Sequence, residues 1–361
     1  MDVAGRSTRL LELLDGAGCD ALLVTDLVGV RYLTGFTGSA GLLLVTPDGS
    51  LLVTDGRYRE QATEQLAASG ARADLAIGTT LTRQRDELTR AAAGIARLGL
   101  QAAHVSWAAQ RSYAGEWFPE AALVPTDGLL EGLRAVKDDG EIARMEAAAD
   151  IADAALAATR PLLSERPTER AFSIALDLEV RHLGADDVSF ETIVGSGPNG
   201  AKPHARPGTR VVEEGDLVVI DFGALVDGYH SDMTRTLVVG EPSSTQARML
   251  EVVLASQAAG VAAVAAGVPC SEIDRACRRV IDDAGWAEAF VHGTGHGVGL
   301  DIHEAPPVSA TSTATLAAGH VVTVEPGVYL PGHGGVRIED TVVVTDGGCR
   351  PITKAPKTTA P

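Results

Sequence analysis

The stretch VIDFGALVDGYHSDMTRT, residues 219–236, decides the fold of the C-terminal part of the chain. Asp227 and Gly228 in its middle form a dipeptide typical of a two-residue hairpin turn, and runs rich in β-branched and apolar residues flank them. A turn at these residues pairs Val226 with Tyr229 and so fixes the register of both strands. The sequence therefore predicts an antiparallel hairpin here.

The predicted register brings two aspartates together. Gly223 falls opposite Asp232, so Asp221 lies on the same face as Asp232, one diagonal step and roughly 7–8 Å away between Cα atoms. Gly223 leaves the intervening position without a side chain. Because Asp221 follows the apolar run LVVI, where an unpaired charge would be costly, we interpret both carboxylates as metal ligands rather than as solvated residues beside a turn.

Two glutamates in later strand-like runs extend this set. Glu325 lies in VVTVEPGVYL (321–330), Glu339 lies in GVRIEDTVVVT (335–345), and a Gly-rich turn joins the two runs. For either residue alone, a solvated charge on an edge strand is the plainer interpretation. Arg337, two residues before Glu339, points to the same face and could orient a carboxylate or a substrate.

The segment FVHGTGHGVGLDIHE (290–304) holds His292, His296 and His303, three of the nine histidines of the chain. The spacing of the first two suits a helical zinc site of the H-E-x-x-H kind. Glycines at alternate positions disfavour a helix, however, and no glutamate follows His292. An extended backbone instead leaves one histidine for a metal and the others for a substrate cavity.

The combined ligand set favours two divalent ions. Four carboxylates in a small space repel one another unless positive charge lies between them. Oxygen ligands with a single imidazole favour Mn²⁺ or a similar first-row ion, although Co²⁺ and Zn²⁺ can occupy such ligands too. We therefore predict a dinuclear site with these metal ligands: Asp221, Asp232, His296, Glu325 and Glu339.

These motifs resemble those of the metallopeptidase family that contains aminopeptidase P and prolidase, the pita-bread peptidases. The segment GSGPNGAKPHARP (195–207) resembles the catalytic-histidine loop of that family. Upstream, VRYLTGFTGSAGLLLV (30–45) and TDGRYREQA (54–62) resemble the N-terminal domain of its proline-specific branch. The resemblance covers the whole chain except its C-terminal tail.

The resemblance implies a role for each ligand. Asp221 would bind one metal, Asp232 and Glu339 would bridge both, and His296 and Glu325 would complete the shell of the second ion. It also implies a set of catalytic residues around the metals: His204, His292, His303, Glu325 and Arg337.

The function that the resemblance implies is that of an Xaa-Pro aminopeptidase, which removes the N-terminal residue from peptides with proline in second position. Metal-activated hydroxide would attack the scissile carbonyl, His204 would stabilise the oxyanion and Glu325 would shuttle the proton. The alternative is an Xaa-Pro dipeptidase, or prolidase. That enzyme needs a cation for the substrate carboxylate, and Arg206 is the arginine left free to provide it.

Two further alternatives share the fold. A methionine aminopeptidase is disfavoured by the N-terminal domain with its DGRY motif, and a metal-free binding module is disfavoured by the five intact ligand positions.

We predict two domains, a small α/β domain over residues 1–132 and a catalytic domain over residues 139–352. Helical and strand-like pieces alternate in the first domain. In the second, the order helix, helix, strands occurs twice, which indicates pseudo-twofold halves with the metals at their seam. The fold class is thus α+β, and the resemblance implies a pita-bread domain after a creatinase-like N-terminal domain. The expected helices of the second domain span 141–159, 168–184, 244–266 and 271–284.

Composition limits the partners and the location. A net charge of −18 and only four lysines disfavour nucleic acid and anionic membranes. No run reaches the roughly 18 apolar residues of a membrane span, nothing reads as a signal peptide, and four unpatterned cysteines suggest free thiols in a reducing compartment. We expect a cytoplasmic protein with a small peptide substrate, and the resemblance implies a homodimer. We also expect the tail, residues 353–361, to be mobile.

Overall fold

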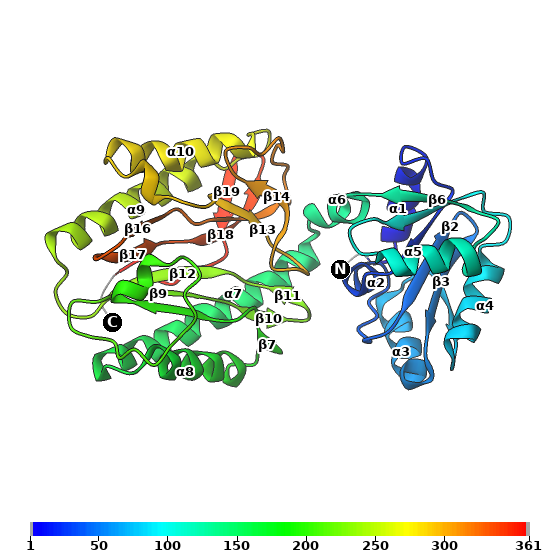
Figure 1. Cartoon of the computed structure of the whole chain (residues 1–361), viewed down its shortest axis with the longest axis horizontal. Coiled ribbons are helices and arrows are strands. Elements are labelled where there is room, and N and C mark those ends of the chain that lie inside the picture. Colours follow the sequence, from blue (N-terminus) through cyan, green and yellow to red (C-terminus); the bar gives the residue numbers. More distant parts are fainter. Residues whose placement is uncertain (1–2, 359–361) are drawn as a thin grey trace. The chain divides into compact units, whose positions relative to one another are not determined.

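The chain forms two compact units, Met1–Arg134 and Ala135–Pro361, and the computed structural model describes residues 3–358 of them (Figure 1). The N-terminal unit is built on one six-stranded sheet in the order β4-β3-β2-β1-β5-β6. The pairs β1–β5, β5–β6 and β3–β4 are parallel, whereas β2 runs antiparallel to both of its neighbours. This sheet and the helices between its strands confirm the predicted small α/β domain.

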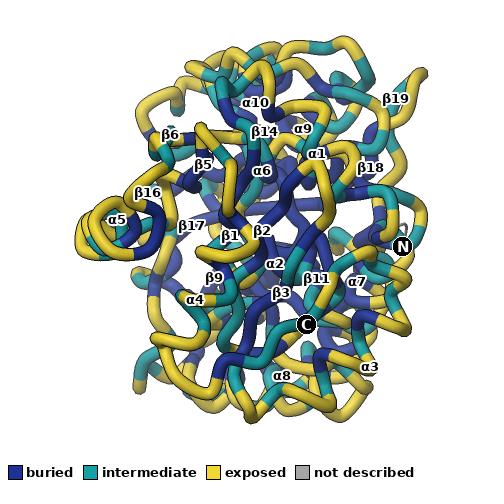
Figure 2. The backbone as a smooth tube through the Cα atoms, turned by 90° about the vertical axis from the view of Figure 1, so that its right-hand side faces the viewer, coloured by how far each residue is buried: buried dark blue, intermediate teal, exposed yellow. Residues whose placement is uncertain are grey.

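The strands of this sheet are β1 (Ala21–Val24), β2 (Leu42–Thr46), β3 (Gly49–Thr54), β4 (Ala73–Ile77), β5 (Arg97–Gln101) and β6 (Ala122–Thr126). The helices are α1 (Arg6–Leu14), α2 (Leu27–Thr34), α3 (Arg59–Ser69), α4 (Leu81–Ala91), α5 (Trp107–Ser112) and α6 (Leu129–Ala135). Strands β1, β2 and β3 are largely buried (Figure 2), and their apolar side chains Leu23, Leu44 and Val53 form part of the core.

The C-terminal unit repeats one arrangement: two packed helices, then three antiparallel strands. The first half contains α7 (Asp139–Thr159), α8 (Glu169–His182), β8 (Ile193–Ser196), β9 (Leu217–Phe222) and β12 (Met233–Val238). The second half contains α9 (Ser244–Ala263), α10 (Cys270–Asp283), β13 (Gly295–Gly297), β15 (Val321–Val324) and β18 (Asp340–Thr345). The strand orders β8-β9-β12 and β13-β15-β18 correspond, which confirms the predicted α+β class and its repeated order.

Shorter strands complete this unit. They are β7 (Asp187–Val188), β10 (Ala224–Val226), β11 (Tyr229–His230), β14 (Glu304–Val308), β16 (Gly327–Leu330), β17 (Gly334–Arg337) and β19 (Gly348–Pro351). Helices α7 and α8 lie on one side of the strands and α9 and α10 lie on the other (Figure 1). Each helix pair covers its own apolar core, which includes Phe172 and Ile220 in the first half and Ile273 and Val322 in the second.

Local signals explain where the long helices begin. Asp138 and Glu141 form a capping box at the start of α7, and Ser243 and Gln246 form another at the start of α9. The Thr168 hydroxyl accepts a hydrogen bond from an amide in the first turn of α8.

The predicted hairpin is confirmed. Val226 pairs with Tyr229, and the same register continues into β9 and β12, where Asp221 faces Thr234. Asp227 and Gly228 both have positive φ, 47° and 74°, as a turn that matches the twist of its strands requires.

Both later strand-like runs are interrupted, contrary to the prediction of continuous strands. The first run splits into β15 and β16 around Glu325 and Pro326, because proline has no N–H to give to a strand ladder. The second splits into β17 and β18, and the Glu339 amide donates at the break to Thr234 O in the other half. Each glutamate therefore lies at the end of a strand and not within it.

The prediction of a mobile tail is wrong for residues 353–358, and residues 359–361 lie outside the described part of the chain. Arg235, which is buried, donates from Nε and Nη2 to Ala355 O at 3.0 and 2.8 Å. Lys357 Nζ lies 2.5 Å from Asp340 Oδ2, whose other oxygen pairs with Arg235. A buried guanidinium needs these acceptors, and they fix the tail.

All four cysteines are free thiols, as predicted, and three of them are buried. Among residues 3–358, no helix has the length and apolar character needed to cross a membrane.

Candidate metal centre

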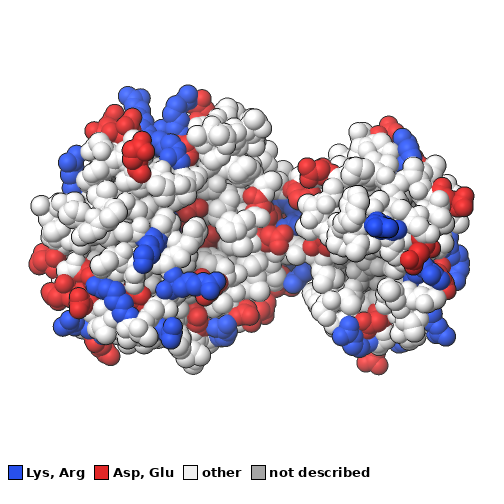
Figure 3. Space-filling model, in the orientation of Figure 1, with Lys and Arg blue, Asp and Glu red and all other residues white. Residues whose placement is uncertain are grey.

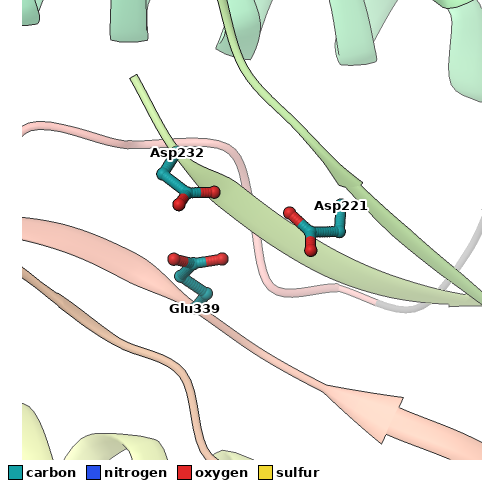
Figure 4. Close-up of side chains that lie close together, drawn as sticks. All are labelled: Asp221, Asp232 and Glu339. Carbon is teal, nitrogen blue, oxygen red and sulfur yellow. The ribbon is translucent and has the colours of Figure 1, made fainter. Parts of the chain in front are cut away.

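Three carboxylates meet where β9, β12 and β18 converge (Figure 4). One oxygen each of Asp221, Asp232 and Glu339 lies within 4.8 Å of the others. Asp221 is on β9, Asp232 directly precedes β12, and Glu339 directly precedes β18. Asp232 and Glu339 are buried, with exposed fractions of 5% and 1%. Both halves of the unit therefore contribute to one acidic cluster.

Gly223 leaves the position between the aspartates without a side chain, and it is also needed for steric reasons. A Cβ atom at this residue would lie 1.9 Å from Ser231 O, so no larger residue fits without a backbone shift. The glycine thus allows the two strands that carry Asp221 and Asp232 to approach.

His296 extends the cluster toward Glu325. Its Nε2 atom lies 3.5 Å from Asp232 Oδ2 and 3.5 Å from Glu325 Oε1. Its Nδ1 atom is 2.9 Å from Gly297 O, and because a carbonyl only accepts, Nδ1 carries the proton. Burial lowers the pKa of His296 to about 4, so the neutral ring presents the Nε2 lone pair to the carboxylates.

Two strand threonines hold acidic side chains of the site. Thr234 Oγ1 donates to Glu339 Oε2 at 2.8 Å, and Thr323 Oγ1 donates to Glu325 Oε1 at 3.3 Å. The His296 amide donates to Thr323 Oγ1 at 3.0 Å. The sequence analysis did not single out either threonine, although strand alternation places both on the faces of the ligands.

The chemistry of the cluster fits a divalent cation. Asp221 Oδ1 and Glu339 Oε1 are buried and accept no hydrogen bond from residues 3–358. Burial, and then the neighbouring carboxylates, raises the pKa values of Asp232 and Glu339 well above the usual range. Burial likewise raises the pKa of Glu325 to about 8, with Arg337 opposing the shift. Cations would satisfy both oxygens and remove the repulsion.

Arg337 connects the cluster to its surroundings. Its guanidinium donates to Asp221 Oδ2 at 2.5 Å, Thr234 Oγ1 at 3.0 Å, Tyr329 Oη at 2.8 Å and Pro203 O at 3.2 Å. Only a planar, multiply donating group can make these four contacts at once. The predicted supporting role of Arg337 is therefore compatible with its contacts.

His292 lies at the end of this hydrogen-bond chain. Its Nε2 atom is 2.9 Å from Tyr329 Oη, and its Nδ1 atom is 2.7 Å from Gly293 O. Burial, and then the charge of Arg337, lowers the pKa of His292 to about 4. The ring is neutral at pH 7, so Nδ1 donates to the carbonyl of Gly293 and Nε2 accepts a hydrogen bond from the Tyr329 hydroxyl.

A cavity of about 290 Å³ opens above the cluster. It is lined by four of the five predicted metal ligands and by all five predicted catalytic residues, while Glu339 lies buried beside it. The His303 ring lies 4.4 Å from the His296 ring, and His204 is exposed on the opposite loop. Its apolar lining residues were not foreseen; they are Phe190, Ile193, Pro203 and Ile302.

The comparisons with known proteins agree with this geometry. Residues 143–346 match the sequence profile of metallopeptidase family M24, and residues 6–136 match that of the creatinase/prolidase N-terminal domain. The chain belongs to metallopeptidase family M24. The predicted family and the hydrolase class are thereby confirmed.

Individual M24 relatives match over nearly their whole length. A Xaa-Pro dipeptidase from Pyrococcus horikoshii is 34% identical, covering 98% of each chain. The solved structure of a Xaa-Pro dipeptidase from Bacillus anthracis is 40% identical with a TM-score of 0.92, covering 98% of each chain. That of an X-Pro aminopeptidase from Thermotoga maritima is 34% identical with a TM-score of 0.89, covering 98% of this chain and 99% of the other.

Arg206, which the sequence suggested as the cation for a substrate carboxylate, does not lie at the cavity of this M24 site. Its side chain is 83% exposed and lies 3.3 Å from Glu191 Oε2, and it does not line the cavity. Strand alternation could not have located it, because residue 206 lies in a loop between β8 and β9.

Proposed function

We propose that this M24 protein is an Xaa-Pro dipeptidase that uses two divalent ions, with Mn²⁺ as the favoured metal. The observation that carries the metal part is the convergence of five ligand-type residues around two orphaned carboxylate oxygens. The substrate part is supported by the names of the dipeptidases that match the whole chain. These relatives favour the dipeptidase over the aminopeptidase that the sequence first suggested.

Within this proposal, the five clustered residues hold the metals. As the family resemblance implies, Asp232 and Glu339 are the bridging candidates, while Asp221 would serve one ion and His296 and Glu325 the other. When bound, two divalent ions would act as Lewis acids and lower the pKa of water enough to give a nucleophile near neutral pH.

The other residues of the cavity would bind and orient the substrate. His204 and His303 face the space above the cluster and can donate to the oxygen of a scissile carbonyl. Glu325 is the candidate proton carrier, because its carboxyl group lines the cavity next to His296. Phe190, Ile193 and Ile302 offer an apolar surface that suits a proline ring.

An aminopeptidase remains a second candidate because of one observation. Arg337 is the only lysine or arginine among the described residues that line the cavity, and its guanidinium already binds Asp221, Thr234 and Tyr329. The cavity thus has no uncommitted arginine or lysine to recognise a substrate carboxylate, as a dipeptidase would use.

The experiment compares Ala-Pro with Ala-Pro-Ala on the Mn²⁺-loaded protein. A kcat/KM for the dipeptide that is about tenfold higher or more, equivalent to about 1.4 kcal/mol of transition-state binding, supports the dipeptidase. Equal or better cleavage of the tripeptide supports the aminopeptidase. Failure to cleave either peptide contradicts both proposals.

We also propose a cytoplasmic location and a homodimeric state. The first rests on composition and the second on the family resemblance. On the face shown in Figure 3, acidic and basic side chains are interspersed, which suits a small peptide better than a nucleic acid. Light scattering at micromolar concentration would test the dimer.

A further inference from the structure

A buried carboxylate at the start of α8 organises the loop that carries His204. Glu169 has an exposed fraction of 0% and accepts hydrogen bonds from Ser196 N at 2.9 Å and Ser196 Oγ at 2.8 Å. It also accepts from Asn199 Nδ2 at 3.0 and 3.1 Å and from Gly208 N at 3.0 Å. Every partner is a donor, so both oxygens of Glu169 act as acceptors.

These contacts fix both ends of one loop. Ser196 and Gly208 bracket residues 197–207, which include His204. The middle of the loop is held separately, because Arg337 donates to the carbonyl of Pro203, the residue before His204. Glu169 does not touch the cavity itself, and it acts on His204 only through the loop backbone.

A second buried carboxylate, on α10, does the same in the other half. Asp274 has an exposed fraction of 0%, and its two oxygens accept from Thr294 Oγ1 at 2.9 Å and from Arg278 Nε at 2.7 Å. Arg278 donates onward to the carbonyls of Phe290 and His292. Its guanidinium also lies over the Phe290 ring, 4.2 Å from the centroid.

One further hydrogen bond links the residues that Asp274 holds to Glu325, a predicted metal ligand. The carbonyl of Thr294 accepts the amide of Glu325 at 2.8 Å. His292 and His296 lie two residues on either side of Thr294. Asp274 thus holds the backbone of the segment that places a predicted metal ligand and a cavity histidine.

The two acids act in a similar way in the two halves. Each lies on the second helix of its half, Glu169 at the first residue of α8 and Asp274 at the fifth residue of α10, and each binds a hydroxyl that lies between two glycines, Ser196 in one half and Thr294 in the other. We propose that Glu169 and Asp274 are positioning residues, the first for His204 and the second for the histidine segment and Glu325. The kinetic and metal-binding consequences rest on the proposed function, whereas the exchange pattern does not.

The test uses the full chain and measures hydrogen–deuterium exchange, bound Mn²⁺ and kinetics for Glu169→Gln and Asp274→Leu. In Glu169→Gln, exchange in residues 196–208 should rise about tenfold or more, and kcat should fall about tenfold or more with KM and metal content nearly unchanged. In Asp274→Leu, exchange should rise instead in residues 290–296 and at Glu325, and Mn²⁺ affinity should fall about tenfold or more.

Matched controls come from the same helices. Asp177→Asn removes the charge of a carboxylate on α8 that accepts from Thr192 Oγ1, and Asp283→Asn removes an exposed carboxylate from α10; neither should change exchange in the two segments. If a primary variant does not fold, Ser196→Ala and Thr294→Val remove the hydroxyl donors, the first together with an acceptor of Arg210, and should give smaller changes of the same pattern.

Uniform exchange increases across the C-terminal unit, or unchanged exchange in the named segments, would overturn the proposal. The exchange and metal measurements do not require peptide hydrolysis. A failure of the proposed function, seen as an inactive parent protein, is therefore distinct from a failure of this inference.

Discussion

Arg337 Nη2 lies 2.5 Å from Asp221 Oδ2 although 116 positions separate the two residues in the sequence. Both side chains are largely buried, with exposed fractions of 3% and 13%. Arg337 belongs to the second half of the C-terminal unit and Asp221 to the first, so this contact ties the halves together beside the carboxylate cluster.

We expect Arg337→Lys to lower kcat/KM by about a hundredfold or more, because one ammonium group cannot replace contacts to Asp221, Thr234 and Tyr329 at the same time. Steady-state kinetics with Ala-Pro and Ala-Pro-Ala would measure the change. Arg350→Lys, at an exposed pair with Glu146, is the control and should retain activity. A fully active Arg337→Lys enzyme would show that the multiple contacts are dispensable.

Glu339→Ala or Asp232→Ala should abolish activity and reduce the bound metal from about two ions to one or fewer, because a bridging carboxylate serves both ions. Elemental analysis after gel filtration gives the stoichiometry. His204→Ala serves as the contrast: it should keep the metal while kcat falls by on the order of a hundredfold. Two ions in an active Glu339→Ala protein would remove the dinuclear assignment.

The metal-free protein should become less stable between pH 6.5 and 8. Because burial raises the pKa of Glu325 from 4.5 to about 8, the folded protein keeps a proton that the unfolded chain has lost. The free energy of unfolding then falls by about 1.4 kcal/mol per pH unit for each such proton. His292 and His296 act in the opposite sense only below pH 6.5, because their pKa values drop from 6.5 to about 4.

Urea unfolding in EDTA at several pH values would measure this slope. Glu325→Gln should flatten it, and saturating Mn²⁺ should stabilise the protein more at pH 8 than at pH 6.5, since metal and protons compete for the carboxylates. Stability that rises with pH over this window in EDTA would contradict the assignment of raised pKa values.

Deleting residues 353–361 should lower the free energy of unfolding by roughly 2–4 kcal/mol, since the buried Arg235 guanidinium loses its two bonds to Ala355 O while Asp340 alone remains as its charged partner. Denaturant titration would measure the loss. Lys354→Ala removes only an exposed ion pair of the tail and should leave the transition midpoint unchanged. An equally unchanged midpoint in the truncated chain would mean that the tail contacts add nothing.

Sequence patterns brought Asp221 and Asp232 together because the hairpin turn fixes the strand register over a short distance. Asp227-Gly228 set the pairing, and strand alternation then placed Asp221 and Asp232 on one face. The positions of Glu325 and Glu339 could be assigned to strand-like runs, but not to strand ends. Pro326 was the available signal for the first break, whereas the second depends on a bond to Thr234 from the other half.

Other features depend on contacts between distant segments, which local patterns do not encode. The order of the C-terminal tail depends on Arg235, about 120 residues earlier in the chain. Glu169 is an ordinary first-turn acid by sequence, and its role emerges only when the His204 loop folds over it. Arg206 was misjudged for the same reason, because the direction of a loop side chain is set by tertiary packing.

Because the carboxylates come from both halves, the cluster forms only when the strands of both halves pair in the correct register. Strands β9 and β12 bring Asp221 and Asp232, while the ends of β15 and β18 bring Glu325 and Glu339. A slip of one residue in either strand pair would turn its acids to the opposite face, and the cluster would not form. A chain folded in a wrong register would then fail to acquire metal, so metal uptake would distinguish correctly folded molecules from compact misfolded ones.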